Sequence, residues 1–308
     1  MKRDIMNLAV VNLKPVWGDK AANYNRIEEY AKCAAKKGID MIVFPEMALT
    51  GYDIENIPKD EMMQIKEAEY IPGPSTEKLS VVAQKYGIYI IFGMPEKDKS
   101  DEKTVYNSAA ILKPDGTILS YQKIHLPGNE ADWATRGNTP MVFDTEWGKV
   151  GLTICYDTYR FRDLAYYMRA KGARLLINCT ACCFEAVNPE MIQRSIEGLA
   201  VDLPIYVASS NLTETDKFNH FMGCSSIVGP ASKGNVYYYA GYGFKDDKGR
   251  MPGMFYATID LELVNLLETR PLFNYNPRVK TPDYRPEIYL KMNEDLLKDQ
   301  HFMSMYHD

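Results

Sequence analysis

Short apolar runs alternate with amphipathic helical patterns over most of the chain, and this alternation limits the possible folds more than any other feature. Residues 41–44 are all apolar, which is typical of a strand covered on both faces. Residues 21–37, just before them, carry apolar side chains at helical spacing and are followed by Gly38, a common residue after a helix. The alternation predicts an α/β domain in which helices join parallel strands.

The same patterns continue to about residue 260. We expect helices over residues 21–37, 75–86, 161–171 and 189–199, and strands over residues 8–13, 41–44, 88–93, 150–154, 174–177, 205–208, 224–228, 236–239 and 255–259. Residues 106–126 read as two strands around a Pro-Asp-Gly turn. Prolines beyond residue 270 predict an extended tail. We therefore expect one domain over residues 1–270 and a C-terminal extension over residues 271–308 that packs on the body or on a partner subunit.

Composition excludes several classes of protein. A net charge of −5 and a pI near 5.6 argue against nucleic acid as a partner. No stretch approaches the roughly 20 apolar residues of a membrane span. The six cysteines are few for the length and lie in apolar segments, which suits reduced thiols. We expect a cytoplasmic protein with no nucleic-acid or membrane partner.

Three reactive side chains lie at or near predicted strand ends. Glu46 follows an apolar strand and Pro45, Cys155 ends another apolar strand, and Lys123 lies in a strand-like run. Each has an ordinary structural explanation, as a solvated charge, a core thiol or a lysine at a sheet edge. Together they make chemical sense. A carboxylate can take the proton of a thiol, and an ammonium can stabilise the oxyanion that forms after the thiol attacks a carbonyl.

The motifs around these residues resemble those of the nitrilase (carbon–nitrogen hydrolase) superfamily. The segments are Phe44-Pro45-Glu46, Leu49-Thr50-Gly51-Tyr52, Tyr121-Gln122-Lys123-Ile124-His125-Leu126 and Gly151-Leu152-Thr153-Ile154-Cys155-Tyr156-Asp157. Their order and spacing also fit the family. The resemblance implies an α-β-β-α sandwich that pairs through its helices into a homodimer or larger homo-oligomer. It also implies an enzyme that needs no metal and no organic cofactor.

The resemblance assigns a role to each matching residue. Glu46 would be the general base, Cys155 the nucleophile that forms a thioester, and Lys123 a stabiliser of the oxyanion together with the backbone N–H of Tyr156. Glu130 would be a second glutamate that orders the site. These roles predict hydrolysis of a small linear amide or N-carbamoyl compound, as in ω-amidases and N-carbamoyl amine hydrolases. A true nitrilase and a non-catalytic scaffold are the alternatives.

The substrate-binding residues are less determined by the sequence. Arg160 or Arg162 would receive a substrate carboxylate through a bidentate pair, although a surface arginine is an equal alternative for each. Tyr52, Tyr156 and Phe184 are expected to line the pocket.

Two further sequence features remain open. Cys179, Cys182 and Cys183 form a cluster that would be a zinc site, an oxidation-sensitive site or plain packing, of which packing is the simplest interpretation. His125 is a rival base for Cys155, because two residues along one strand place it on the same side as Lys123. We favour a structural hydrogen-bonding role for His125.

Overall fold

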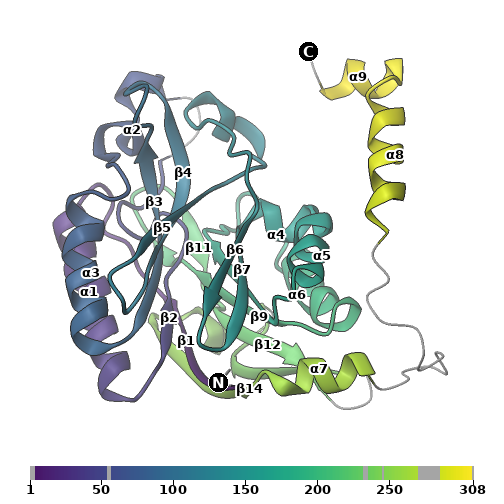
Figure 1. Ribbon diagram of the computed structural model, residues 1–308. Helices are drawn as coiled ribbons and strands as arrows, with labels where there is room; N and C mark the ends of the chain where they lie inside the picture. Colours follow the sequence, from purple (N-terminus) through teal and green to yellow (C-terminus); the bar gives the residue numbers. More distant parts are fainter. Residues whose placement is uncertain (1–3, 54–56, 232–234, 245, 270–284, 307–308) are drawn as a thin grey trace.

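Two six-stranded sheets form the centre of the computed structural model, which describes residues 4–53, 57–231, 235–244, 246–269 and 285–306 (Figure 1). The first sheet has the order β14-β1-β2-β3-β4-β5. Its strands are β1 (Ile5–Asn12), β2 (Met41–Val43), β3 (Tyr89–Lys97), β4 (Val105–Leu112), β5 (Ile118–Gln122) and β14 (Gly253–Asp260).

The second sheet has the order β13-β12-β9-β8-β7-β6. Its strands are β6 (Met141–Thr145), β7 (Gly148–Ile154), β8 (Leu175–Thr180), β9 (Tyr206–Asn211), β12 (Ser226–Pro230) and β13 (Val236–Gly241). A separate hairpin pairs β10 (Thr213–Thr215) with β11 (His220–Met222).

Both sheets repeat one pattern of strand directions. From β14 to β5, successive pairs are antiparallel, parallel, parallel, antiparallel and antiparallel. From β6 to β13 the same series occurs. The parallel pairs at the centre of each sheet require crossover connections, and helices supply them. Each half of the domain is therefore built from the same kind of unit.

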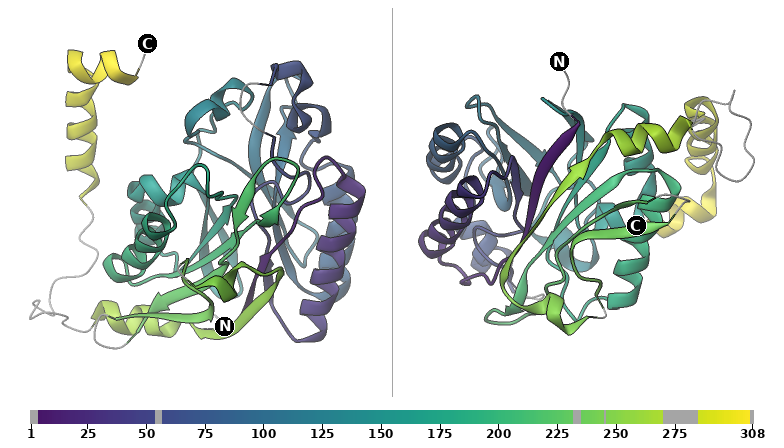
Figure 2. Two further views of the ribbon diagram at one scale, coloured as in Figure 1. Left: turned by 180° about the vertical axis from the view of Figure 1, so that it is seen from behind. Right: turned by 90° about the horizontal axis from the view of Figure 1, so that it is seen from below.

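Helices cover the outer face of each sheet. They are α1 (Lys20–Lys36) and α3 (Pro74–Tyr86) on the first sheet, and α4 (Tyr156–Arg160), α5 (Arg162–Ala170) and α6 (Pro189–Asp202) on the second. The view from below in Figure 2 shows the two helical layers on opposite sides of the paired sheets. Apolar residues of both sheets, such as Leu8, Ile91, Leu152 and Ile177, form one core between them. The predicted α-β-β-α sandwich is confirmed.

Local signals explain where several of these helices begin and end. The Asp19 side chain accepts from the Ala22 N–H at the start of α1, and the Asn188 side chain accepts from the Glu190 N–H at the start of α6. Pro189 occupies the first turn of α6, where its missing N–H costs no hydrogen bond. Gly87 ends α3 in the left-handed conformation. These signals explain why helices are observed close to the residue ranges 21–37, 75–86 and 189–199 predicted from sequence.

Three expectations were wrong in detail. Strand β5 ends at Gln122, so Lys123 and His125 are not on one strand and do not share a strand face. The strand expected from Cys224 begins at Ser226, because Cys224 has a φ of 58°. The tail is not extended throughout, since α8 (Pro286–Leu296) and α9 (Gln300–Tyr306) are helical.

The C-terminal helices lie to one side of the sandwich body in Figure 1, and α8 buries none of its residues. The proposed domain boundary near residue 270 lies outside the described residues, just after α7 (Glu262–Thr269). Pairing with a second subunit stays a prediction. Of the described helices, none combines the length and the apolar character that a membrane crossing requires. The remaining short helical segments are α2 (Met63–Glu67), η1 (Lys59–Glu61), η2 (Gly128–Asp132) and η4 (Asp247–Arg250).

Candidate active site

Cys155 lies in a sharp turn between a buried strand and a helix. Strand β7 ends at Ile154 and α4 begins at Tyr156, and Cys155 itself has a φ of 50° and a ψ of −103°. A residue other than glycine adopts such a backbone conformation only where its surroundings enforce it. The Cys155 N–H donates to the carbonyl of Cys179 (2.9 Å) and to Oδ1 of Asn178 (3.0 Å). Cys155 as a residue is half-buried, and the strained turn fixes it at the end of β7.

Asn178 on β8 makes four side-chain hydrogen bonds, three of them to residues 155–159. Its Oδ1 accepts from Cys155 N–H and from the Thr158 hydroxyl (2.8 Å), and its Nδ2 donates to the hydroxyls of Tyr159 (3.0 Å) and Ser209 (2.9 Å). The side chain is fully buried, and every polar atom of it has a partner. The parallel pairing of β7 with β8 brings Asn178 to Cys155.

Glu46 lies at the equivalent end of the first sheet, beyond β2. Its carboxylate is only 1% exposed. The segment turns sharply at Met47, which has a φ of 52°, and packs against Gly93 on β3. The Gly93 N–H donates to the carbonyl of Pro45 at 2.9 Å. Backbone hydrogen bonds therefore fix the position of a buried carboxylate.

Lys123 joins two buried carboxylates. Its Nζ lies 2.8 Å from Oε1 of Glu46 and 2.7 Å from Oε2 of Glu130, which is on η2. Burial opposes the charge of Lys123, but the carboxylates of Glu130 and Glu46 outweigh burial and raise the pKa of the ammonium well above its usual value. Burial also raises the pKa of Glu130, against the effect of Lys123. Lys123 is therefore a cation at neutral pH.

Asn107 on β4 completes this cluster and was missed in the sequence. Its Nδ2 donates to Oε1 of Glu46 (2.7 Å) and to Oε1 of Glu130 (2.6 Å). The backbone carbonyl of Asn107 accepts from the Lys123 backbone N–H at 2.8 Å. The one signal in the sequence is a polar residue within an apolar strand, and such a residue marks no particular chemistry by itself. The pairing of β4 with β5 places Asn107 beside the end of β5.

The charged cluster acts on the Cys155 thiol. A hydrogen bond with Cys182, burial and the negative charge of Glu46 raise the pKa of Cys155 well above its usual value, while Lys123 lowers it. The thiol is therefore protonated at neutral pH in the free protein. The sequence placed Cys182 in a cluster whose simplest interpretation was packing, and in the structure Cys182 belongs to the buried core against which Cys155 packs.

Asp157 links the turn at Cys155 to the segment after Lys123. Its buried carboxylate accepts from the Tyr121 hydroxyl (2.6 Å), the His125 N–H (2.9 Å) and the Ile124 N–H (3.3 Å), and it lies 2.8 Å from Nδ1 of His125. The His125 ring also stacks on Phe161, with centroids 3.4 Å apart and planes 6° apart. His125 thus has the hydrogen-bonding position that we favoured, with its Nδ1 turned to Asp157.

The three aromatic residues predicted to line the pocket have different neighbours. Tyr52 lies beside the cluster, where burial and the charges of Glu130 and Glu46 raise its pKa well above the usual value. Tyr156 is half-buried as the first residue of α4, so its N–H has no acceptor within that helix. Phe184 lies further along, packed against His220 and the Arg250 guanidinium.

The two candidate arginines differ in their surroundings. Arg160 is exposed at the end of α4. Arg162 forms an ion pair with Asp202 at the end of α6. Contact of either arginine with a substrate carboxylate stays a prediction.

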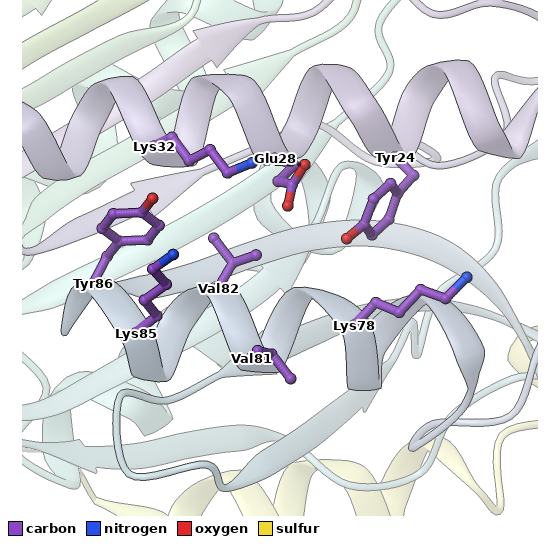
Figure 3. Close-up of a pocket in the computed structure, with 8 residues that line it drawn as sticks. All are labelled: Tyr24, Glu28, Lys32, Lys78, Val81, Val82, Lys85 and Tyr86. Atoms are coloured by element: carbon purple, nitrogen blue, oxygen red, sulfur yellow. Dashed lines mark ion pairs between the residues drawn. The ribbon is translucent and has the colours of Figure 1, made fainter.

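The groove drawn in Figure 3 lies away from the candidate catalytic residues. It has a volume of about 350 Å³ and runs between α1 and α3 on the outer face of the first sheet. Its lining residues are Tyr24, Glu28, Lys32, Lys78, Val81, Val82, Lys85 and Tyr86. Its lining includes none of the predicted catalytic residues, and we assign it no catalytic role. Among the described residues, no group of three or more histidine, cysteine or acidic side chains has the arrangement of a metal site.

Comparison with known proteins defines the class. The family model described as carbon–nitrogen hydrolase matches residues 7–267, and the chain belongs to this family, within the nitrilase superfamily. It is therefore a hydrolase of carbon–nitrogen bonds, as the motifs indicated.

Two curated relatives and one solved structure are similar to this chain over most of its length. The chain is 36% identical to omega-amidase NIT2 of Xenopus tropicalis over 225 residues, which covers 68% of this chain and 76% of the relative. It is 35% identical to omega-amidase NIT2 of Homo sapiens over 237 residues, covering 72% and 80%. Its structure is similar to that of Saccharomyces cerevisiae Nit3, with a TM-score of 0.76, 25% identity and coverage of 90% and 98%.

Proposed function

We propose that the chain hydrolyses linear amides, with ω-amides of carboxylic acids as the substrate class, through a thioester on Cys155. The observation that carries this proposal is the buried cluster of Glu46, Lys123 and Glu130, of which Glu46 and Lys123 act on the thiol of the half-buried residue Cys155. The similarity to the omega-amidases of Xenopus tropicalis and Homo sapiens supports the substrate class.

Glu46 acts as the general base for Cys155. Because the pKa of the Cys155 thiol is raised, the thiolate is scarce at neutral pH and forms as the thiol attacks the amide carbon. The proton passes to the Glu46 carboxylate, whose charge acts on the thiol in the free protein. Glu46 then returns the proton to the leaving ammonia as the C–N bond breaks and the thioester remains.

Lys123 and the Tyr156 N–H stabilise the oxyanion of the tetrahedral intermediate. Lys123 is held as a cation, and donors fixed in advance lower the barrier most where water is excluded. Glu130 and Asn107 keep the Lys123 ammonium and the Glu46 carboxylate in place. In the second half of the reaction, Glu46 takes a proton from water as the water attacks the thioester carbon. The C–S bond then breaks, the carboxylic acid leaves, and Glu46 returns the proton to the Cys155 sulfur.

The far end of an ω-amide carries a carboxylate. Arg160 is our candidate to bind it, since Arg162 is engaged by Asp202. Tyr52 lies beside the charged cluster and would contact the amide end. Phe184 lies two residues beyond Cys182 and would border the pocket on that side.

The test is ammonia release from a panel of ω-amides, simple carboxamides, N-carbamoyl amines and nitriles. We expect release from ω-amides, its loss in Cys155→Ala, and its retention in Cys183→Ala, which removes a neighbouring thiol. Mass spectrometry of rapidly quenched protein should show an acyl group on Cys155.

The other outcomes separate the alternatives. Release only from N-carbamoyl amines or only from nitriles would replace the substrate class. Release that persists in Cys155→Ala would contradict the mechanism. Silence across the panel without an acyl group on Cys155 would favour the non-catalytic scaffold.

A further inference from the structure

The hairpin of β10 and β11 follows a strand of the second sheet and has a well-defined tip. Its two strands pair over Thr213–Thr215 and His220–Met222, and residues 216–219 form the tip. Oδ1 of Asp216 accepts from the backbone N–H groups of Phe218 (2.8 Å) and Asn219 (2.7 Å). The Asp216 N–H donates to the Asn219 carbonyl at 3.1 Å. These bonds hold the tip in one tight turn.

The Lys217 ammonium binds the tip to the loop between β1 and α1. Its Nζ lies 4.1 Å from the ring centroid of Trp17, in that loop, and 4.8 Å from the ring centroid of Phe218. The two rings meet edge to face, with their centroids 5.7 Å apart. A cation over an aromatic ring is attracted to it even where the lysine is exposed, as Lys217 is. Two aromatic side chains therefore hold one cation at the tip.

Two further contacts join the tip to Gly51 and Tyr52. The Asn219 side chain donates through Nδ2 to the backbone carbonyl of Tyr52 at 3.2 Å. A β-carbon on Gly51 would lie 3.3 Å from the α-carbon of Trp17 and 3.8 Å from Oδ2 of Asp216, so Gly51 packs against both the loop and the tip. A shift of the tip would therefore move the backbone of this segment.

Gly51 and Tyr52 come directly after the turn that carries the candidate base. The Gly51 N–H donates to the carbonyl of Met47 at 2.8 Å, and Met47 is the residue after Glu46. The Tyr52 ring meets the ring of Trp133, directly after η2, edge to face with centroids 6.3 Å apart. The hairpin tip therefore contacts the segment on which the position of Glu46 depends.

Strand β11 contacts the other half of the site. The carbonyl of Cys182 accepts from the Met222 N–H (2.9 Å), and the Phe184 N–H donates to the carbonyl of His220 (3.0 Å). The segment of Cys182 and Phe184 follows β8, which lies beside β7, the strand that leads into Cys155. One hairpin thus contacts the turn after Glu46 and the segment next to Cys155.

We propose that the β10–β11 hairpin fixes the position of Glu46 relative to Cys155, and that Lys217 and Asn219 are positioning residues for amide hydrolysis. This inference rests on the proposed function. Glu46 and Cys155 extend from different sheets, so their separation depends on contacts between the two halves. The hairpin supplies such a contact through its tip and through β11. A small displacement of a reacting group lowers the rate steeply, although the fold is kept.

Two variants remove the contacts of the tip singly. They are Lys217→Ala and Asn219→Asp, and the aspartate keeps the shape of asparagine but has no donor for the Tyr52 carbonyl. We expect kcat for ω-amides to fall about tenfold in each variant, while KM changes by less than about twofold, because the base moves and the substrate contacts remain. Lys217→Arg keeps a cation over the rings and should retain most of the wild-type kcat. Thr215→Ala, an exposed change in the same hairpin, is the matched control and should have wild-type kinetics.

A second measurement does not depend on activity. Hydrogen–deuterium exchange with peptide mapping reports how often the backbone hydrogen bonds of residues 47–52 open. We expect faster exchange over these residues in Lys217→Ala and Asn219→Asp, and wild-type exchange in Thr215→Ala. Exchange in the buried strand β8 is the internal reference that shows whether each variant is folded.

The inference is overturned by wild-type kcat in both Lys217→Ala and Asn219→Asp, or by wild-type exchange over residues 47–52 in both. A rise in KM with unchanged kcat would also overturn it, since the two residues would then act on substrate binding. If the wild type releases no ammonia from any amide, the proposed function fails. The exchange data then still decide whether the hairpin holds the turn after Glu46.

Discussion

Gly93 lies directly against the backbone of Glu46. A β-carbon at position 93 would lie 2.5 Å from the Glu46 α-carbon and 2.5 Å from the Met47 nitrogen. Strand β3 approaches the Glu46 segment this closely only because residue 93 has no side chain. The candidate base therefore depends on a glycine in a neighbouring strand.

Gly93→Ala should displace Glu46 and lower both activity and stability. Overpacking of this kind costs about 1–3 kcal/mol, and a small shift of the base lowers kcat about tenfold or more. Thermal unfolding and ammonia release measure the two effects. Gly253→Ala is the control, because nothing lies within 4 Å of a β-carbon there. A normal kcat in Gly93→Ala would contradict the dependence.

Asn107→Leu should raise the pKa of the Glu130 carboxylate, which loses a hydrogen bond that lowers it. A donor to a carboxylate stabilises the ionised form, so its removal moves the acidic limb of kcat/KM to higher pH. The free energy of unfolding should fall by about 1.5–3 kcal/mol, as expected for hydrogen bonds to charged groups. The pH profile is the decisive measurement, and an unshifted acidic limb would speak against a positioning role for Asn107.

Asp157→Asn should lower kcat more than it changes KM. The variant has one oxygen acceptor where the wild type has two, so the bonds from Tyr121 and from the His125 backbone cannot all persist. The segment that carries Lys123 would then move relative to Cys155. Asp163→Asn, an exposed change on the next helix, is the control. Equal kcat and KM in the two variants would contradict a role for Asp157 in positioning the segment that carries Lys123.

Alkylation of Cys155 should accelerate with pH and not level off below about pH 9. The raised pKa of the thiol means that its thiolate fraction grows about tenfold per pH unit over this range. Iodoacetamide labelling followed by peptide mapping gives the rate at Cys155 alone, with the exposed Cys33 as a reference for the reagent. A plateau near neutral pH would show that the thiolate is already formed in the free protein.

Arg160→Gln should raise KM for ω-amides by about tenfold or more, as expected for loss of a charged pair, and leave KM for simple carboxamides unchanged. Arg162→Gln is the matched control. It breaks a surface pair with Asp202, which contributes about 1 kcal/mol at most to stability, and should not change KM. An unchanged KM for ω-amides in Arg160→Gln would remove that residue from the pocket.

The sequence was most informative where a reactive side chain follows a buried strand. Glu46 and Cys155 were singled out because apolar runs lead into them, and both lie in sharp turns after their strands. Asn107 and Asn178 were missed because a buried asparagine in a strand has no motif of its own. Its role depends on neighbouring strands, such as the one that brings Asn107 to Glu46, 61 residues away in the chain.

Other errors arose from local backbone geometry. His125 was placed on the same side as Lys123 because the strand appeared to continue, but the Lys123 carbonyl accepts from the Gly137 N–H as the chain leaves β5. The repeated pattern of strand directions in the two sheets was also invisible, because the two halves share topology without recognisable sequence similarity.

The division of the site between two sheets has a consequence for refolding. Glu46 and Lys123 extend from one sheet and Cys155 from the other, so neither half of the sandwich holds a complete site. During renaturation, circular dichroism can recover as each half gains its own strands and helices. Hydrolysis can return only after the halves dock. The delay between the recovery of circular dichroism and the recovery of hydrolysis would therefore measure how long the two sheets take to dock.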